Sequence, residues 1–326
     1  MSYTSMGKDM KNRIIASIIV ATKYRAYSLN TFLNSLKETG HLNRKDIEVI
    51  IIDNTSGNSP TKNICEKFGA IYLIQPIKGK SKSQNLGIEH SCGRYLIFTD
   101  DDVVIDDINW ANKFINKFEN NPTLGYLSGD VVAIDMTNDI QRLWENKGGL
   151  SKGKIRKYWT NNQLRYSKKI WPLTQFCAGA NCAIPKSVMD VTGPYCELLG
   201  PGGLIGHGES IEIGYRVIKE GYDVEYDPEI HVLHKHPITS LELKRKLFLY
   251  GIGDTALHMH IFYTQKDWRS LRWALYGHPL YSLGKIVRRI IGKYPLPINF
   301  IVFSLVGSCL GSWLYILKLR SFLVKQ

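Results

Sequence analysis

The 326-residue sequence lacks the short motifs that most often mark a nucleotide or metal site. No G-x-G-x-x-G follows the first apolar run, which argues against an ordinary dinucleotide-binding half, and the absence of G-x-x-x-x-G-K-[ST] excludes a P-loop enzyme. The six cysteines include no C-x-x-C pair, and their spacing matches no zinc module. No motif of an RNA- or DNA-binding module is present, so we expect no nucleic-acid partner.

The sequence also shows no export signal. Its polar start, MSYTSMGKDMKNR, has no apolar core of the kind that a signal peptide needs. Reduced cytosolic thiols are therefore the expectation. Apolar residues make up 44% of the chain and charged residues 22%, as in an ordinary globular protein. The length suits one large α/β domain with an extension.

Positive charge is concentrated near the C-terminus. The whole chain has a formal net charge of +13, and the last 92 residues, from Lys235 onward, contain fourteen Lys and Arg against three acidic residues. Such a surface suits either nucleic acid or anionic lipid. An adjacent apolar segment favours lipid.

That segment, Tyr294–Leu317, contains no charged residue. A helix of this length can cross the roughly 30 Å hydrocarbon core of a bilayer. Gly307 and Gly311 form a small-xxx-small pair that allows helices to approach closely. Basic residues flank both ends, and polar residues interrupt the segment, so a helix lying in the membrane plane is an alternative to a crossing. A buried core helix is the third interpretation; membrane contact is the one we expect.

The first 130 or so residues alternate apolar strands with helices. A helix after Tyr24 and another near residue 60 separate the strands, and a third, capped by Ser81 or Ser83, is expected to end at Gly93. This β-α-β order predicts a parallel sheet whose ligands bind beyond the carboxyl ends of the strands. The expected strands are 14–21, 47–53, 70–74 and 95–99, and the expected helices are 28–38, 60–68 and the third one ending at 93.

The strand Tyr95–Thr99 runs directly into three carboxylates, Asp100, Asp101 and Asp102. Like charges repel each other at a strand end, and a divalent cation offsets this repulsion. Carboxylate ligands at positions i and i+2 suit Mg²⁺ or Mn²⁺. A solvated acidic turn is the alternative. The positions from Thr22 to Tyr24, together with Asp53, also lie at strand ends and are expected to converge on the same crevice.

Three segments in collinear order carry a family resemblance: ASIIVATKYRAYSLNTFLNSL with EVIIIDNTSGN, then GKSKSQNLGIEHSCGRYLIFTDDDV, then FCAGANCAIPKSVMDVTGPYCELLGPGGLIGHGE with YDPEIHVLHKH. Over residues 14–237 the chain resembles a family 2 glycosyltransferase with the GT-A fold, an α/β architecture with a mostly parallel, Rossmann-like sheet flanked by helices. The resemblance implies transfer of a sugar from a nucleotide-sugar donor, with inversion, assisted by Mg²⁺ or Mn²⁺.

The resemblance also assigns roles to individual positions. Thr22 and Asp53 match nucleoside contacts, and Asp100 and Asp102 match the ends of the DxD motif, which binds ribose and metal. His234 matches a position that completes the metal site or contacts the diphosphate, with His236 as the alternative. The residues expected to bind the nucleotide-sugar are Thr22, Tyr24, Asp53, Lys82, Asn85, Asp100 and Asp101, and those expected to bind the metal are Asp100, Asp102 and His234.

Two positions depart from the family pattern. Relatives carry an Asp as the catalytic base where this chain has Ser210, so Glu209 is expected to be the base, and Glu212, on the same helical face, is the other candidate. Glu209 alternatively only opens the helix 209–220, and weak or lost catalysis is a further possibility. Gln84 replaces an Arg that lies near the phosphates, and Lys80 or Lys82 is expected to substitute for it.

We therefore predict a GT-A domain over residues 1–237, with a nucleotide-binding half at 14–133 and an acceptor half at 134–237. A basic, helical, membrane-associating extension is predicted over 238–326, with its hydrophobic segment at 294–317. The predicted function is inverting transfer to a glycan or lipid-linked acceptor at the cytoplasmic face of the cell membrane. A non-catalytic sugar-nucleotide- or glycan-binding relative is the alternative, and a nucleotidyltransferase is a distant third.

Overall fold

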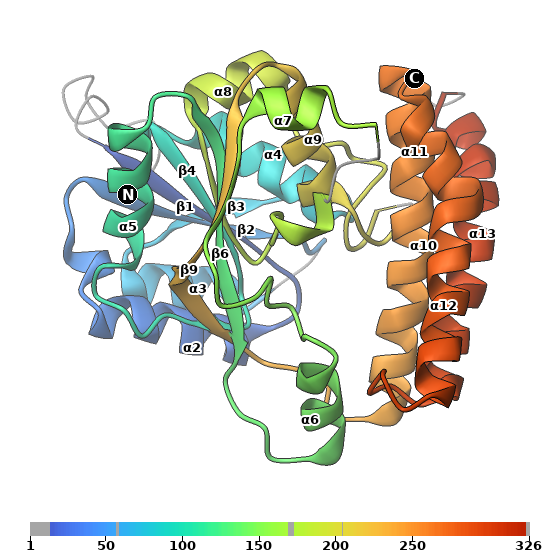
Figure 1. Ribbon diagram of the computed structural model, residues 1–326. Coiled ribbons are helices and arrows are strands. Elements are labelled where there is room, and N and C mark those ends of the chain that lie inside the picture. Colours follow the sequence, from blue (N-terminus) through green and yellow to red (C-terminus); the bar gives the residue numbers. More distant parts are fainter. Residues whose placement is uncertain (1–13, 57–58, 169–172, 204, 324–326) are drawn as a thin grey trace.

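The structure is a computed structural model, and it describes residues 14–56, 59–168, 173–203 and 205–323 (Figure 1). A nine-stranded sheet forms the centre, in the order β3-β2-β1-β4-β8-β6-β9-β5, with β7 paired to β9. Helices cover both faces of this sheet, and the C-terminal helices stand together beside it (Figure 1). This arrangement of a central sheet with flanking helices is the predicted GT-A architecture with a helical C-terminal extension.

Four parallel strands carry the N-terminal half of the sheet. They are β1 (Ala16–Thr22), β2 (Ile47–Asp53), β3 (Ile71–Ile74) and β4 (Tyr95–Asp100). Their apolar runs are buried on both faces, as continuous hydrophobic strands of parallel sheets are. In the register, Thr22 lies opposite Asp53, and Ala21 lies opposite Asp100. The carboxyl ends of β1, β2 and β4 therefore meet at one place, as predicted.

The second half of the sheet combines parallel and antiparallel strand pairs. β8 (Asn181–Pro185) is antiparallel to both β4 and β6 (Leu124–Ala133). β9 (Asp223–His234) is parallel to β6 but antiparallel to β5 (Val103–Val104) and β7 (Lys157–Trp159). The β5–β9 pairing places Val103 opposite His234, so the end of β9 lies beside the turn that carries the three aspartates.

The two faces of the sheet bury separate cores. Alternate residues of β1 point to opposite sides, so Ile18 and Val20 belong to one core and Ile19 to the other. Helices α2 (Ala26–Glu38), α3 (Thr61–Phe68) and α5 (Trp110–Asn120) pack on the first core. Helix α9 (Glu209–Lys219) packs on the second, together with residues of α8 (Lys186–Thr192). Single-turn 3₁₀ helices lie at His41–Asn43 and Leu173–Gln175.

Helix α4 (Lys80–His90) differs from its prediction at both ends. Neither Ser81 nor Ser83 caps it: the N-cap is Gly79, and the Ser81 hydroxyl instead donates to the carbonyl of Leu199. The helix also ends three residues before Gly93. A Cβ atom at Gly93 would lie 2.5 Å from the Ser17 backbone nitrogen, so the glycine permits close contact with β1 and is not a C-cap.

Two short helices, α6 (Asp139–Asn146) and α7 (Asn161–Arg165), lie in the segment between β6 and β8, and each begins with a capping box. The C-terminal part contains α10 (Ser240–Gln265), α11 (Trp268–Arg272), a π-helical turn at Trp273–Gly277, α12 (His278–Ile290) and α13 (Ile298–Leu323). The predicted domain boundary at residue 237 falls between β9 and α10. A division into two separate domains stays a prediction.

The predicted close approach at Gly307 and Gly311 is confirmed, within the chain itself. A Cβ atom at Gly307 would lie 2.2 Å from the carbonyl oxygen of Phe248, and one at Gly311 would lie 2.2 Å from that of Ile252. Both carbonyls belong to α10, so α13 packs along α10 with its backbone almost in contact. This pairing gives α13 one face buried in protein.

Helix α13 is also the candidate membrane segment. By length and composition, Ile298–Leu319 could cross a bilayer, and 39% of its most apolar window is buried inside the protein. The helix itself begins at Ile298, so Tyr294–Pro297, the first part of the predicted segment, precedes it. Its outer face stays apolar and exposed, which the contact with α10 does not explain.

Candidate active site

Buried polar groups gather where β1, β2 and β4 end. Asp53, the last residue of β2, is fully buried, and its Oδ2 accepts a hydrogen bond of 3.2 Å from the Tyr72 hydroxyl. Its Oδ1 is buried too and has no hydrogen-bond partner within the described ranges. A buried carboxylate oxygen without a donor is unfavourable unless a ligand supplies one. Asp53 therefore has the chemistry of a ligand-binding residue.

The middle aspartate of the triplet is bonded to two neighbouring side chains. Asp101 Oδ2 accepts a 2.6 Å hydrogen bond from the Thr22 hydroxyl, and Asp101 Oδ1 lies 3.0 Å from Nη1 of Arg25. Burial raises the pKa of Asp101 to about 6, although Arg25 and Thr22 oppose this shift. Thr22 and Asp101 are both predicted nucleotide ligands, and the structure shows them bonded to each other. Tyr24, next to them, has a φ of 53° and an exposed side chain.

The two outer aspartates come together with a histidine from β9. One ligand atom each from Asp100, Asp102 and His234 lie within 4.8 Å of one another. His234 Nε2 is 3.3 Å from Asp102 Oδ1, and the buried Nδ1 of His234 has no partner in the described parts of the chain. Although burial disfavours its charge, the hydrogen bond from His234 and the nearby Arg25 hold the pKa of Asp102 well below its usual range. Two carboxylates and an imidazole fit a divalent metal ion.

Lysine 80 joins this cluster to the candidate base. Its Nζ forms an ion pair with Asp100 Oδ1 and lies 4.0 Å from Oε1 of Glu209. Burial opposes the charge, but the carboxylates of Asp100 and Glu209 raise the pKa of Lys80 above its ordinary value. We call Asp100, Asp102 and His234 the metal-type cluster. The ammonium group of Lys80 therefore lies between this metal-type cluster and the N-terminus of α9.

The other predicted residues of α4 contact the segment that follows α8. Lys82 Nζ pairs with the Glu197 carboxylate. The Asn85 amide accepts a 2.8 Å hydrogen bond from the backbone nitrogen of Tyr195 and donates one of 3.0 Å to its carbonyl. Of the two lysines considered as substitutes for the missing arginine, only Lys80 touches the aspartate cluster.

Glu209 is the first residue of α9 and is 4% exposed. Gly208 precedes it with a φ of 107°, a conformation that glycine adopts without strain. Glu209 Oε2 is buried without a hydrogen-bond partner among the described residues. Like the free oxygen of Asp53, it is an acceptor available to a ligand, and here it lies next to Lys80.

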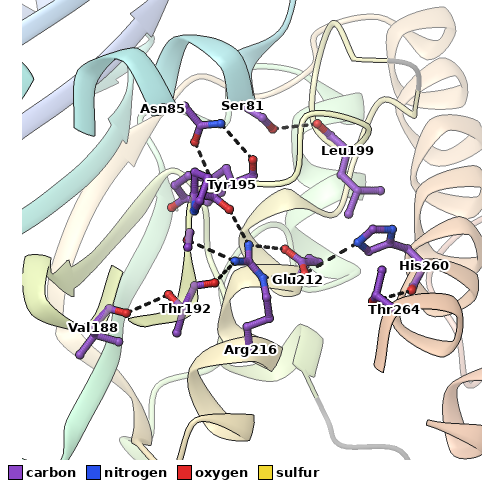
Figure 2. A network of polar contacts seen from close by, with 12 residues as sticks. Ser81, Asn85, Val188, Thr192, Tyr195, Leu199, Glu212, Arg216, His260 and Thr264 are labelled. Atoms are coloured by element: carbon purple, nitrogen blue, oxygen red, sulfur yellow. Dashed lines mark hydrogen bonds and ion pairs between the residues drawn. The ribbon is translucent and has the colours of Figure 1, made fainter. Parts of the chain in front are cut away.

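Glu212, the second candidate base, has both oxygens engaged. Arg216 donates from Nε to Oε1 and from Nη2 to Oε2, each over 2.8 Å. The same guanidinium donates to the carbonyls of Thr192 and Pro194, and His260 approaches the carboxylate from α10 at 3.9 Å (Figure 2). The structure thus places Glu212 in an ion-paired network that joins α9 to the end of α8.

His236, the alternative metal ligand, is not part of the metal-type cluster. Its Nε2 contacts the Glu145 carboxylate, and its ring meets Trp144 edge-on at 6.4 Å. Burial, and after it the charges of His234 and Lys246, lower the pKa of His236 to about 4. The ring is therefore neutral near pH 7, and it packs against the metal-type cluster from outside, with its centre 5.7 Å from that of His234.

A cavity of about 410 Å³ lies away from these strand ends, between α5 and β9. It includes none of the predicted site residues, and its charged side chains neutralise one another: Lys117 pairs with both Glu225 and Asp227. We therefore assign the functional site to the strand ends and not to this cavity.

The sequence profile of glycosyl transferase family 2 matches residues 17–192, more than half of the chain and all of the strands that carry Thr22, Asp53 and Asp100. The chain belongs to glycosyl transferase family 2. A stretch of 118 residues is 30% identical to an uncharacterized glycosyltransferase of Rickettsia conorii. That match covers 35% of the chain but only 19% of the relative, so the chain spans about a fifth of the relative's length.

Among solved structures, a mannosyltransferase of Pyrobaculum calidifontis, in complex with GDP-Man and Mn²⁺, is similar over 95% of this chain and 92% of its own. The TM-score is 0.59 at 13% sequence identity, so the likeness concerns the fold. It includes the C-terminal helices, because a match over 95% of the chain cannot leave out residues 240–323.

Within this family 2 member, sequence reasoning missed two residues at the site. Arg25 bonds to Asp101 and, over 2.7 Å, to Asp102 Oδ2. The sequence feature that could have revealed Arg25 is its position: it follows the end of β1 by three residues, at the sheet edge where the three aspartates also lie. Arg216 determines which glutamate stays free, and its signal was the i, i+4 spacing from Glu212 on a predicted helix.

Proposed function

We propose that the chain is a metal-dependent, inverting glycosyltransferase that uses a nucleotide-sugar donor. One observation carries the proposal: Lys80 contacts Asp100 of the metal-type cluster on one side and approaches Glu209 on the other. Donor phosphates at the cluster and an acceptor hydroxyl at Glu209 would then lie on either side of one reacting sugar. Such positioning is the main requirement for group transfer.

Donor binding is assigned to the strand ends. The free Oδ1 of Asp53 accepts from an N–H or hydroxyl of the nucleoside, and the exposed ring of Tyr24 lies at the same edge. Asp100, Asp102 and His234 would hold the cation, which supplies neutralisation of the leaving diphosphate. The histidine favours Mn²⁺ over Mg²⁺, since imidazole is a ligand for transition metals while Mg²⁺ prefers oxygen alone.

Glu209 is assigned as the base. In an inverting displacement, the acceptor hydroxyl attacks the anomeric carbon from the side opposite the leaving diphosphate, and a carboxylate takes the hydroxyl proton. Glu209 offers a buried oxygen without a partner beside Lys80, whereas both oxygens of Glu212 are bonded to Arg216. Ser210 cannot act as a carboxylate base, so the neighbouring residue takes the role that an Asp has in relatives.

The partner surface is assigned to the outer faces of α12 and α13. Exposed apolar residues recur there at helical spacing, and basic residues lie in the last turn of α12. This combination suits a helix pair that lies on an anionic membrane, so we place the enzyme at the cytoplasmic face with a glycan or lipid-linked acceptor. The apolar residues are Leu280, Leu283, Val287 and Ile290 of α12, and Val306, Leu310, Trp313 and Leu317 of α13.

Donor binding and slow donor hydrolysis test the proposal. A panel of nucleotide-sugars with Mn²⁺ should include one that raises the melting temperature, because a ligand that binds only the folded state stabilises it. Asp102→Ala should fold and lose this Mn²⁺-dependent shift, while Asp106→Ala, in an exposed pair with His231, should keep it. Binding without any release of nucleoside diphosphate would instead favour the non-catalytic relative. An unchanged shift in Asp102→Ala would refute the metal site.

A further inference from the structure

A group of lysines next to the active site has no acidic partner. Lys147 and Lys246 lie over the ring of Trp144, at 4.2 and 4.8 Å from its centre, and Lys285 lies 4.3 Å from that of Tyr281. For the part of the chain that the structure describes, no carboxylate is within ion-pair distance of these three amines. Like charges repel, so a cluster of half-buried cations is favourable only when an anion joins it.

The cluster borders a cavity of about 70 Å³ between α6, α10, α12 and α13. This volume is several times the roughly 10–15 Å³ that one water molecule needs, so a small ionic group fits. One side of the cavity is basic, with Lys147 and Lys285. Apolar side chains also line the cavity and form its apolar wall: Leu247, Leu296, Phe300 and Ile301.

The acidic residue of this cavity is Asp254, and it belongs to a separate pair. Asp254 Oδ2 is 3.1 Å from Nε2 of His278, whose Nδ1 in turn contacts the Ser308 hydroxyl at 2.8 Å. Asp254 therefore joins α10 to α12 and α13 and forms no ion pair with the lysines, and its charge offsets the lowering of the pKa of Lys147 and Lys285 only in part. In keeping with this, burial, and after it repulsion from Lys285, Lys152 and Lys246, lower the pKa of Lys147 to about 7.

Ring contacts connect this cavity to both sides of the proposed active site. On the metal side, His234 lies beside His236, whose ring touches Trp144, the ring that carries Lys147 and Lys246. On the base side, Tyr250 lines the cavity and stacks on His207 at 4.4 Å, two residues before Glu209. An anion bound by the lysines would thus lie next to the place where the acceptor hydroxyl must be.

We propose that Lys147, Lys246 and Lys285 bind the phosphate of a lipid-linked acceptor, whose hydrocarbon chain follows the apolar wall of the cavity towards the exposed faces of α12 and α13. Three amines offer charge-assisted hydrogen bonds to phosphate oxygens. The apolar wall excludes a fully polar acceptor, and the basic side excludes an uncharged lipid. This inference rests on the proposed function and narrows its acceptor to a sugar joined through phosphate to an isoprenoid or other lipid, in which a sugar hydroxyl is the nucleophile.

Calorimetric titration of the full chain with farnesyl phosphate tests the proposal directly, without catalysis. We expect binding that is at least tenfold tighter than that of farnesol, which lacks the phosphate, and of inorganic phosphate, which lacks the chain. Lys147→Gln and Lys285→Gln should each weaken binding of farnesyl phosphate about tenfold, and Lys285→Arg should retain most of it. Arg288→Gln, on the same helix but exposed and bonded to the Gly284 carbonyl, should bind like the wild type.

Three results would overturn the inference. The Lys147→Gln, Lys285→Gln double variant could bind farnesyl phosphate as tightly as the wild type, or Arg288→Gln could lose as much affinity for it as the cluster variants. The third is that the wild type binds inorganic phosphate as tightly as farnesyl phosphate. Binding to vesicles that contain phosphatidylglycerol shows whether the lysines recognise the anionic headgroups of a membrane in general or a single acceptor molecule. If the cluster variants and Arg288→Gln lose vesicle binding alike, while only the cluster variants lose farnesyl phosphate, the site is an acceptor site. Mn²⁺-dependent nucleotide binding, measured in the same variants, should stay unchanged. If the wild type shows no Mn²⁺-dependent nucleotide binding, this result counts against the proposed function and not against the lysine site.

Discussion

Arg216 reaches back one turn along α9 and bonds to both carboxylate oxygens of Glu212, with two N–H···O distances of 2.8 Å. Glu212 is buried and Arg216 is half-buried, and the guanidinium also donates to backbone carbonyls at the end of α8 (Figure 2). Both oxygens of Glu212 are therefore engaged in charge-assisted hydrogen bonds. Glu209, in contrast, has a buried carboxylate oxygen without a hydrogen-bond partner among the described residues.

The first prediction separates these two glutamates. Glu209→Gln should keep the affinity for the donor and lower sugar transfer by about a hundredfold to ten-thousandfold, the usual contribution of general base catalysis. Glu212→Gln should leave turnover within a few-fold of the wild type but lower the free energy of unfolding by about 2–3 kcal/mol, since Arg216 would lose its charged partner. Single-turnover kinetics and chemical denaturation measure the two effects.

Ser210→Asp is the matched variant for the same question, because it restores the residue that relatives carry. A large gain in transfer would show that this chain has traded catalysis away, and wild-type rates in both Gln variants would place the base elsewhere. Ser210 is buried, and its hydroxyl oxygen lies 2.6 Å from the position of a Cβ atom at Gly179. The added carboxylate must therefore displace its neighbours, and donor binding is the check that the fold survives.

Strand positions were predictable because their signal is local. β1, β2 and β4 are continuous apolar runs buried on both faces, and each lies within two residues of its prediction. The aspartate cluster followed from the same reasoning, since parallel strands end at one edge. Strand direction beyond β4 was not predictable, because β8 pairs antiparallel with β4 across some eighty residues whose path no local pattern fixes.

The side-chain partners were not predictable, because they depend on tertiary contacts. Sequence spacing puts Glu209 and Glu212 on one helical face, yet Arg216 engages only Glu212. Lys80 and Lys82 are equivalent by composition. The start of α4 at Gly79 directs the first toward Asp100 and the second toward Glu197. Two residues apart on a helix, the two lysines point in different directions, so the direction of each depends on where the helix begins, and element boundaries are the least reliable part of a prediction from sequence.

A second prediction concerns acid stability. Burial, followed by the charge of Arg44, lowers the pKa of His41 to about 4. Between pH 6.5 and 4 the unfolded chain therefore binds a proton at this histidine that the folded chain does not, so the free energy of unfolding falls as the pH falls through this range. The full effect at pH 4 is about 3 kcal/mol. Denaturant unfolding of the wild type and His41→Gln at pH 7.5 and pH 4.5 should show a smaller loss in the variant. Equal losses would contradict the assignment.

A third prediction tests the contact between α10 and α13. Gly311→Ala should lower the free energy of unfolding by about 1–3 kcal/mol or more, since its methyl group would lie 2.2 Å from both the Ile252 carbonyl and the Thr255 hydroxyl. Gly284→Ala on α12 is the matched control: no described atom lies within 4 Å of its Cβ position. Alanine there should be neutral or stabilise by up to about 1 kcal/mol through helix propensity. Similar effects at both glycines would mean that the helices do not pack as described.

The last prediction concerns the membrane, and substitution tests it better than truncation. Removing α13 would uncover Ile252 and Ala256, which are buried on α10, and the shortened chain would expose a new apolar face. Leu310→Ser and Trp313→Ser change only exposed side chains of α13, so the fold should stay intact. We expect the double variant to bind vesicles of phosphatidylcholine and phosphatidylglycerol at least tenfold more weakly than the wild type.

Salt distinguishes the two forces in that binding. Screening weakens the attraction of Lys and Arg to anionic lipid but leaves apolar burial unaffected, so 1 M salt should release the wild type only partly and the Leu310→Ser, Trp313→Ser variant completely. Leu241→Ser, at a leucine near the start of α10 that is even more exposed than Leu310, is the control for general loss of surface hydrophobicity and should bind like the wild type. A wild-type chain that stays monodisperse in buffer without detergent and ignores both kinds of vesicle would show that α13 is an ordinary core helix. The exposed apolar faces of α12 and α13 would then need another partner.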